Sequence, residues 1–484
     1  GRYFILISAT NAGGTTEKEI RIDVFQLDVP TISIADANKG FKVLQGSELT
    51  ITPIVDSFLE TNYSWQINGE DISNELTCTL PTIELGEYQV RFATHNEDGD
   101  DEVTFKVEVC SPDQVDFNWT FLQTEYNMSA GRTIRIKPVD VNNALDAVYT
   151  WTVDNEQVQS GENDTYLFTS EQQGEHTVKV EMKNSYILAT QTLKVNVCPP
   201  AGTYQRKISA TSSASMNKVY EYLPAPGQFI NENHNTTTMA EACTYAEERI
   251  NQTAYVSLGG FGGYIIVGFD HSIVNDGDYN IAITGNAFDG SSEPGIVWVM
   301  QDENGDGLPN DTWYELRGSE YGKAETWQDY AVTYHKPSGI QLPTPWTDNH
   351  GQSGSIDYLG AFHRQDYYYP AWVKEKQYTL RGTRLKERNY DQSGNGTYWV
   401  NDSYEWGYAD NFSAIDRLTD DDNYNAGPSD NHFKISHAVT FDGKDANLKY
   451  VDFIKVQVGV NSKSGWLGEI STEVFGIKDF NMLE

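Results

Sequence analysis

Cysteine is scarce in this chain. Four cysteines stand among the 484 residues, at positions 78, 110, 198 and 243, and no two of them form a C-x-x-C pair. So few cysteines exclude a disulfide framework in a chain of this length, and their spacing argues against a zinc site. We therefore expect these side chains to act as small buried hydrophobes.

Positive charge is also scarce. Lys and Arg number 34 against 70 Asp and Glu, so the formal net charge is −36. A surface this acidic repels nucleic acid and anionic membrane faces, which excludes nucleic acid as a partner. Metal cations and neutral small molecules remain as possible ligands.

Long apolar runs are absent. No stretch approaches the ~20 apolar residues that a membrane helix needs. The first residues read as a strand, and they lack the basic start and apolar run of a signal peptide. We therefore expect that the chain is not a primary translation product.

Catalytic signatures are missing as well. The sequence contains no G-x-S-x-G, no H-E-x-x-H and no phosphate-binding loop after a strand. The run GGFGG at 259–263 is a glycine-rich turn with no helix behind it. We therefore expect no enzyme activity, although 70 acidic residues leave a carboxylate pair for glycoside hydrolysis open.

A pair of alternating strands, by contrast, occurs three times. The copies begin at Gly1, Gly86 and Gly174, and each has an asparagine ten positions later, at Asn11, Asn96 and Asn184. Apolar residues alternate with polar ones along both strands of each copy. This period of two predicts antiparallel strands with one buried face.

Further repeated features precede the second and third copies. GSELTITP begins at Gly46 and GRTIRIKP at Gly131, and each is followed by an alternating strand that carries a tryptophan, Trp65 or Trp151. This order is typical of an antiparallel sandwich with a Trp in its core.

The Gly-x-Tyr start of the penultimate strand resembles that of bacterial Ig-like and PKD-like modules, in which the tyrosine often ties down a corner. Tyr3 and Tyr88 match this pattern and His176 does not.

The repeats divide the chain into four parts. We predict the C-terminal fragment of an Ig/PKD-like module at 1–28, complete modules at 29–110 and 111–198, and a ligand-binding domain at 199–484. Proline at the ends of linkers 109–112 and 197–200 would stiffen the joints. We therefore interpret the modules as a spacer without catalytic residues, with direct ligand binding by the modules as the alternative.

The C-terminal part differs from the repeats. Apolar strands are predicted at 262–270, 279–284, 295–300 and 451–460. A helix is predicted over 239–252, with Ala240, Cys243, Ala246 and Ile250 on its apolar face and a cap within Thr236–Thr238. The fold class is therefore all-β: tandem sandwiches, then a large β-sandwich or jelly-roll-like domain with one or two short helices.

The segment QDENGDGLPND at 301–311 resembles a calcium loop. Asp302, Asn304 and Asp306 alternate before Gly307, and oxygens spaced in this way converge on Ca²⁺. The closing Glu is replaced by Trp313, so Asp311 or Glu315 would close the loop. A plain turn between strands is the alternative. We interpret the acidic run TDDDN at 419–423 as a solvated loop.

Aromatic residues gather in two segments, DYYYPAW near 369 and TYWVNDSYEWGY near 404. Neighbouring strand residues face opposite ways, so some rings should be exposed and form a binding surface. An aromatic core beneath a long loop is the alternative. The predicted ligand-binding residues are His363, Tyr367, Tyr368, Tyr369, Trp372, Trp399, Tyr404 and Trp406.

Four segments, at 218–232, 257–270, 291–320 and 459–474, resemble the C-terminal domain of surface lipoproteins from gut Bacteroidetes. Some of these lipoproteins are encoded in cobamide uptake loci beside a TonB-dependent receptor and capture vitamin B12. The resemblance implies a monomeric outer-membrane lipoprotein, with its anchor outside this chain, that binds a cobamide for uptake.

The motif D-x-H-x-x-G, which lets a histidine replace the cobamide lower base, is incomplete here. Asp430 and His432 are present and the glycine is not. A cobamide should therefore bind without that exchange, and His350 and His363 stay open as cobalt ligands. A calcium-containing glycan-binding surface protein is the alternative function, and a hydrolase or a purely adhesive protein are further hypotheses.

Overall fold

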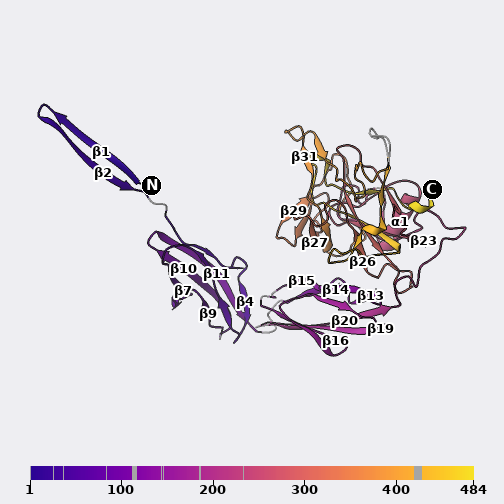
Figure 1. Cartoon of the computed structure of the whole chain (residues 1–484), viewed down its shortest axis with the longest axis horizontal. Helices are drawn as coiled ribbons and strands as arrows, with labels where there is room; N and C mark the ends of the chain where they lie inside the picture. Colours follow the sequence, from indigo (N-terminus) through magenta and orange to yellow (C-terminus); the bar gives the residue numbers. More distant parts are fainter. Residues whose placement is uncertain are drawn as a thin grey trace. The chain divides into compact units, whose positions relative to one another are not determined.

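The computed structural model of the chain is all-β, with a single α-helix in the part it describes (Figure 1). The described residues are 2–24, 27–35, 37–82, 84–111, 117–142, 144, 146–184, 187–232, 234–418 and 428–483. The predicted acidic loop at 419–423 and the linker proline at position 112 lie outside them. The chain forms two compact units, which comprise residues 1–124, 137–166 and 177–192, and residues 125–136, 167–176 and 193–484.

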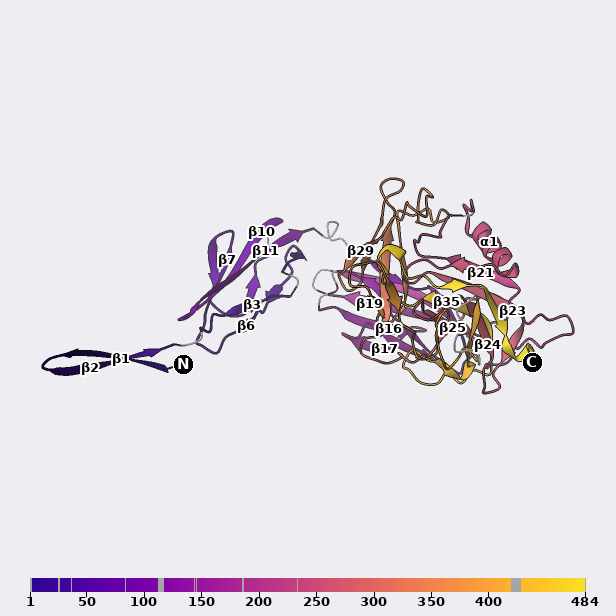
Figure 2. The ribbon, with the colours of Figure 1, turned by 90° about the horizontal axis from the view of Figure 1, so that it is seen from above.

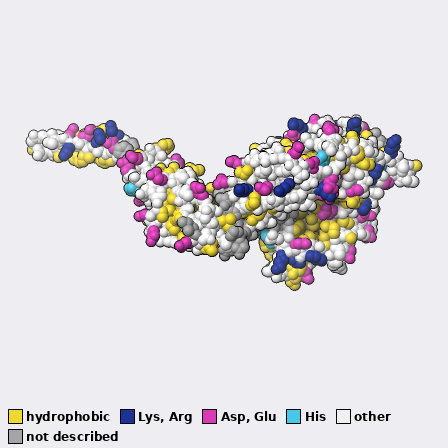
Figure 3. All heavy atoms as spheres, turned by 90° about the horizontal axis from the view of Figure 1, so that it is seen from below, with side chains coloured by type: hydrophobic (Ala, Val, Ile, Leu, Met, Phe, Trp, Pro, Cys, Tyr) yellow, Lys and Arg dark blue, Asp and Glu magenta, His cyan; other side chains and the backbone are white. Residues whose placement is uncertain are grey.

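The first repeat copy is a two-stranded hairpin, β1 (Arg2–Asn11) with β2 (Gly14–Asp23). Its apolar side chains are exposed, including Tyr3 at 58% and Ile5 at 47%. They can be followed along the hairpin in Figure 3. Two strands alone bury no core, as is expected of an isolated hairpin.

The second copy belongs to a sandwich module. Its larger sheet has the order β4 (Phe41–Leu44), β11 (Gly99–Cys110), β10 (Gly86–Asn96), β7 (Asn62–Ile67) and β8 (Glu70–Ser73). Opposite lie the pairs β3 (Thr31–Ser33) with β6 (Ile54–Asp56) and β5 (Leu49–Ile51) with β9 (Cys78–Leu80). Trp65 is fully buried, with its ring centroid 4.5 Å from that of Phe92.

The third copy repeats this topology. Its larger sheet has the order β13 (Glu125–Ser129), β20 (Leu188–Cys198), β19 (Gly174–Lys183), β16 (Val148–Val153) and β17 (Glu156–Gly161). The smaller pairs are β12 (Trp119–Phe121) with β15 (Pro138–Val141) and β14 (Thr133–Ile136) with β18 (Tyr166–Thr169). Trp151 is fully buried, so both predicted core tryptophans are confirmed.

The second and third copies differ at the residue that ties down the corner before the penultimate strand, which is Tyr88 in one and His176 in the other. Tyr88 OH donates to the carbonyl oxygen of Glu84, four residues upstream, at 3.0 Å. His176 Nε2 donates to the carbonyl oxygen of Gln172, also four residues upstream, at 2.9 Å. His176 is thus not a tyrosine, but it makes the equivalent hydrogen bond in its module.

The C-terminal domain is built on a six-stranded sheet. The order is β21 (Lys218–Leu223), β23 (Tyr264–Val274), β35 (Tyr450–Val458), β25 (Gly295–Met300), β26 (Trp313–Leu316) and β34 (Ala438–Val439). The other sheets are β33 (Ser429–Phe433), β24 (Ile281–Gly285) and β37 (Gly476–Asp479), and β29 (Ser353–Ile356), β28 (Thr344–Asp348), β27 (Trp327–His335) and β30 (Gln377–Arg384). Two short pairs are β22 (Val256–Ser257) with β36 (Glu473–Val474) and β31 (Asn389–Asp391) with β32 (Trp399–Asn401). The four predicted strands of this domain are confirmed as β23, β24, β25 and β35.

The predicted helix is confirmed as α1 (Met239–Asn251), which lies beside β21 (Figure 2). Thr238 caps it, because its Oγ1 accepts from the Glu241 amide and the Glu241 carboxylate accepts from the Thr238 amide. The predicted apolar face was partly wrong. The buried residues are Ala242, Ala246 and Ile250, spaced by four, whereas Ala240 is exposed. Short 3₁₀ helices span Ile435–His437 (η2), Gly465–Leu467 (η3) and Phe480–Met482 (η4).

None of the four cysteines forms a disulfide, as predicted. Those at 78, 110 and 198 are buried, and Cys243 is half-buried. Burial raises the pKa of the Cys198 thiol to about 11, which keeps it protonated and unreactive. Within the described residues, no helix is long and apolar enough to cross a membrane.

Candidate functional site

The predicted calcium loop is a tight turn held by its own side chains. The carboxylate of Asp302 accepts hydrogen bonds from the amides of Gly305 at 2.7 Å and Gly307 at 3.0 Å. Asp306 accepts from the Leu308 amide at 2.7 Å and from the Asn304 side-chain amide at 2.8 Å. The loop oxygens therefore converge mainly on donors within the loop.

Asp311 lies apart from this turn, in the interior. Its Oδ2 accepts from the Glu303 amide at 2.9 Å, and its Oδ1 is buried without a hydrogen-bond donor. Burial raises its pKa to about 8. The carboxylates of Asp302, Asp306 and Asp311 do not gather into a group of three in the described structure, so calcium at this loop stays a prediction. Glu315, the other residue considered for closing the loop, accepts instead from Thr383 Oγ1 at 2.5 Å.

Glu303, within the same loop, forms a buried ion pair that the sequence did not reveal. Its Oε1 lies 3.2 Å from Arg132 Nε, and its Oε2 accepts from the Ser129 amide at 3.0 Å. The Glu303 side chain is 1% exposed. Burial raises its pKa to about 7, and the Arg132 charge opposes this rise. These contacts tie β13 to the start of the loop.

Four of the predicted ligand-binding aromatics lie in the interior. Tyr368, Tyr369, Trp372 and Tyr404 are each at most 6% exposed. Each donates to a backbone carbonyl, as buried Tyr and Trp usually do; Tyr369 OH, for example, donates to that of Glu375 at 3.0 Å. The aromatic-core alternative therefore describes these four residues.

The remaining predicted residues lie at separate places. Tyr367 is half-buried, with Lys336 Nζ 5.7 Å from its ring. His363 Nδ1 lies 2.6 Å from Glu232 Oε1. His350 stacks on Trp327 at a centroid distance of 4.3 Å. These contacts already engage each side chain with a protein neighbour.

Two exposed aromatic rings nevertheless lie together on the C-terminal domain. We call Phe362, Trp399, Trp466 and Leu467 the aromatic edge. Phe362 is 67% exposed and Trp466 51%. The Phe362 and Trp466 centroids are 6.3 Å apart. Of these four residues, the sequence prediction included Trp399 alone.

Gly465 joins the two halves of the aromatic edge. It has φ +53°, and a Cβ there would lie 2.1 Å from Trp399 Nε1, so the Trp399 ring packs directly on the turn that carries Trp466. Asn389 fastens the same contact, because its Nδ2 donates to the Lys463 carbonyl at 2.7 Å and its Oδ1 accepts from Ser462 Oγ at 2.9 Å.

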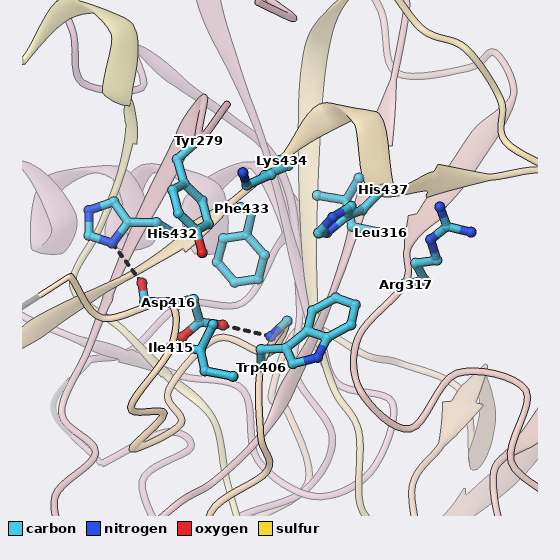
Figure 4. Close-up of a pocket in the computed structure, with 11 residues that line it drawn as sticks. Tyr279, Leu316, Arg317, Trp406, Ile415, Asp416, His432, Phe433, Lys434 and His437 are labelled. Atoms are coloured by element: carbon cyan, nitrogen blue, oxygen red, sulfur yellow. Dashed lines mark hydrogen bonds between the residues drawn. The ribbon is translucent and has the colours of Figure 1, made fainter. Parts of the chain in front are cut away.

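Trp406 lines a separate cavity of about 300 Å³ (Figure 4). Its ring centroid lies 5.1 Å from that of His437, whose pKa burial lowers. His432 Nδ1 donates to the carbonyl oxygen of Asp416 at 2.8 Å. The other lining residues are Tyr279, Leu316, Arg317, Gly407, Ile415, Phe433 and Lys434. The cavity wall thus carries five aromatic or imidazole rings, two cations and Asp416.

Comparison with known proteins identifies the repeats. Residues 29–96 and 121–184 each match the family model of the PKD-like domain. Domains of this kind are typical of extracellular and cell-surface proteins. No curated protein matches the chain.

Solved structures with similar parts are Ig-like and fibronectin-like tandems. The fibronectin(III)-like modules of Clostridium thermocellum CbhA share 15% identity, with 37% of this chain and 100% of that chain covered and a TM-score of 0.23. The Ig1-2 module of the Drosophila receptor protein tyrosine phosphatase DLAR shares 11%, with 35% and 98% covered and a TM-score of 0.19. The match of two segments to one family model, together with their shared sheet order, shows that the chain contains tandem Ig-like repeats of the PKD-like type.

Proposed function

We propose that this chain is a cell-surface binding protein whose C-terminal domain captures a cobamide at the aromatic edge. The observation that carries the proposal is the pairing of two exposed rings, Phe362 and Trp466, beside Trp399. Soluble proteins rarely leave such rings together in water unless they bind something. The resemblance of residues 200–484 to the surface lipoproteins of cobamide uptake loci supplies the ligand.

The chemistry of a cobamide suits this surface. Its corrin ring offers a broad, largely apolar face with amides around the rim, and aromatic side chains with polar neighbours contact such a face well. The cavity beside Trp406, at about 300 Å³, is at the lower limit for an ordinary small ligand. This cavity has room for only a fragment of a cobamide, whereas the open aromatic edge can contact a whole face of the corrin ring.

The wider role follows from the same proposal. An outer-membrane lipoprotein would hold the domain outside the cell and deliver the cobamide to a TonB-dependent receptor. The PKD-like repeats would act as its spacer, with the protein as a monomer. The surface acidity visible in Figure 3 is compatible with a ligand that carries only one phosphate.

The test is titration calorimetry of the whole chain with cyanocobalamin. We expect binding, and we expect Trp466→Ala to weaken it at least about tenfold, because aromatic anchors commonly dominate binding energy. Trp406→Ala, in the cavity, is the matched control and should keep wild-type affinity. Absence of heat with the wild-type chain would overturn the proposal, and equal loss in both variants would move the site away from the aromatic edge.

The second candidate is a glycan-binding protein that contains calcium. The observation in its favour is the same pair of exposed rings, Phe362 and Trp466, since aromatic faces also stack on sugars. A glycan array probed in calcium-containing buffer separates the candidates. Hits that depend on Trp466, with no response to cyanocobalamin, would favour the glycan.

A further inference from the structure

Three acidic side chains from distant parts of the chain meet in the C-terminal domain. Glu293 precedes β25, Asp410 follows the aromatic segment, and Glu473 begins β36. One carboxylate oxygen of each lies within 4.8 Å of the other two. In the described part of the chain this is the one group of three metal-ligating side chains gathered so closely.

Asp410 anchors the group. It is fully buried, and its Oδ1 accepts from the backbone amides of Asn286 at 2.7 Å and Ala287 at 2.8 Å. Its Oδ2 accepts from the Glu473 amide at 2.9 Å. Three backbone donors therefore fix this carboxylate in place, and its Oδ2 keeps a further lone pair.

Glu473 supplies an independent sign that the group takes a ligand. The residue is 4% exposed, and its Oε1 is buried with no hydrogen-bond donor. A buried carboxylate oxygen without a partner is costly. Within the described residues, no lysine, arginine or histidine pairs with any of the three carboxylates to offset their charge. A cation or a shared proton must therefore lie among them.

The make-up of the group favours calcium over magnesium. Ca²⁺ takes six to eight oxygen ligands, carboxylates among them, whereas Mg²⁺ keeps several of its waters and is usually held by one or two carboxylates. We propose that the three carboxylates of Glu293, Asp410 and Glu473, which lie within 4.8 Å of one another, form a binding site for one divalent cation, Ca²⁺ in preference to Mg²⁺. Glu293 is half-buried and gives the ion a route from solvent.

The Asn286 side-chain amide lies beside the group. One of its terminal atoms lies 3.1 Å from Asp410 Oδ1 and 3.3 Å from Oδ2. An amide nitrogen there donates to the bare carboxylate, and with the cation bound the amide would turn its oxygen toward the ion.

The ion would brace the aromatic segment of the domain. The Asp410 carbonyl accepts from the Glu293 amide, and Gly295 and Ala409 exchange two backbone hydrogen bonds, each at 2.9 Å. Asp410 thus ends the stretch that holds Trp399 and Trp406, and the ion would clamp this end to β36. The proposal does not depend on which ligand the aromatic edge takes.

The test is calcium binding by the whole chain after treatment with a chelator, measured by calorimetry and by thermal unfolding. We expect Ca²⁺ to bind, to raise the unfolding temperature of the C-terminal domain, and to do so more strongly than Mg²⁺. Glu473→Gln should lower the number of bound ions by one, or weaken one site at least about tenfold.

Two matched variants define the controls. Glu469→Gln changes another buried carboxylate, outside the group, and should keep the ion. Asp306→Asn changes the 301–311 loop and should likewise leave this site intact. The wild-type arm requires no variant to fold. The proposal fails if the wild-type chain shows no response to Ca²⁺, or if the response survives Glu473→Gln and Asp410→Asn but is lost in Asp306→Asn.

Discussion

The two PKD-like modules and the C-terminal domain bury different kinds of side chain. Between residues 29 and 198, the described buried residues include no aspartate and no glutamate. The C-terminal domain buries Asp302, Glu303, Asp311, Glu315, Glu320, Asp410, Asp416, Asp452, Glu469, Glu473 and Asp479. Burying a carboxylate costs free energy that a hydrocarbon core never incurs. The buried carboxylates, each of which needs a hydrogen-bond donor, a proton or a cation, therefore lie in the C-terminal domain and not in the described part of the modules.

The largest expected loss of stability comes from removing the buried tryptophan of a module. Trp65→Ala should cost about 4 kcal/mol of the free energy of unfolding of its module, because a fully buried tryptophan leaves a large cavity. Denaturant unfolding measures this. The matched control is Phe58→Ala, at a position 95% exposed, which should be close to neutral. Ligand binding by the C-terminal domain should stay unchanged in both variants.

A smaller loss of stability is expected from breaking the buried ion pair between Arg132 and Glu303. Arg132→Ala should cost about 3 kcal/mol, because it leaves the Glu303 carboxylate buried without its cation. Arg91→Ala, which breaks an exposed pair with Glu102, should cost less than about 1 kcal/mol. Thermal unfolding of both variants tests this, and equal losses would contradict it.

Between pH 5 and 8, the pH dependence of stability should come mainly from the C-terminal domain, which holds the buried carboxylates with raised pKa values. Burial raises the pKa of Glu469 to about 7. The native state therefore keeps this proton where the unfolded chain has lost it. The contribution of the protonated Glu469 to stability is fully present below the pKa that Glu469 has in the unfolded chain, and it is lost as the pH rises through 7. The free energy of unfolding of the wild-type chain should therefore fall between pH 5 and 8. In Glu469→Gln we expect this fall to be smaller by about 2 kcal/mol. Calorimetric scans at several pH values check this, and an equal slope in the variant would refute it.

The smallest effect concerns the corner bonds of the modules. Tyr88→Phe removes one hydrogen bond to the Glu84 carbonyl and should cost about 1 kcal/mol. His176→Tyr should be nearly neutral, since tyrosine restores the donor of the other copy. Denaturant midpoints distinguish the two. A large loss in His176→Tyr would show that the corners are not equivalent.

The repeats could be predicted because their signal is local. Alternation of apolar residues and a Trp in each copy state which face of a strand is buried, and neighbouring strands suffice to form the sheet. The burial of Tyr368 and Tyr404 could not be predicted in this way, because ring exposure depends on segments far along the chain. The helix face was misjudged for the same reason: α1 packs by Ala242, Ala246 and Ile250.

The candidate sites were missed where single residues meet across long separations. Phe362 and Trp466 touch although more than a hundred residues separate them, and neither stands in an aromatic run. The carboxylates of Glu293, Asp410 and Glu473 are equally scattered. In the acidic cluster that is visible in the sequence, at 301–311, the carboxylates of Asp302 and Asp306 accept hydrogen bonds from amides of the same loop. Short-range motifs thus indicated turns, whereas tertiary contacts assembled the sites.

The parallel pairing of β4 with β11, and of β13 with β20, bears on how each module responds to mechanical force. In both modules an early strand lies parallel to the last one. Pulling the two chain ends apart would slide these strands along each other, so their hydrogen bonds would be loaded together and would have to break together. Cys110 and Cys198 add no covalent link. Tension along the repeats would therefore be resisted by this one parallel ladder in each module.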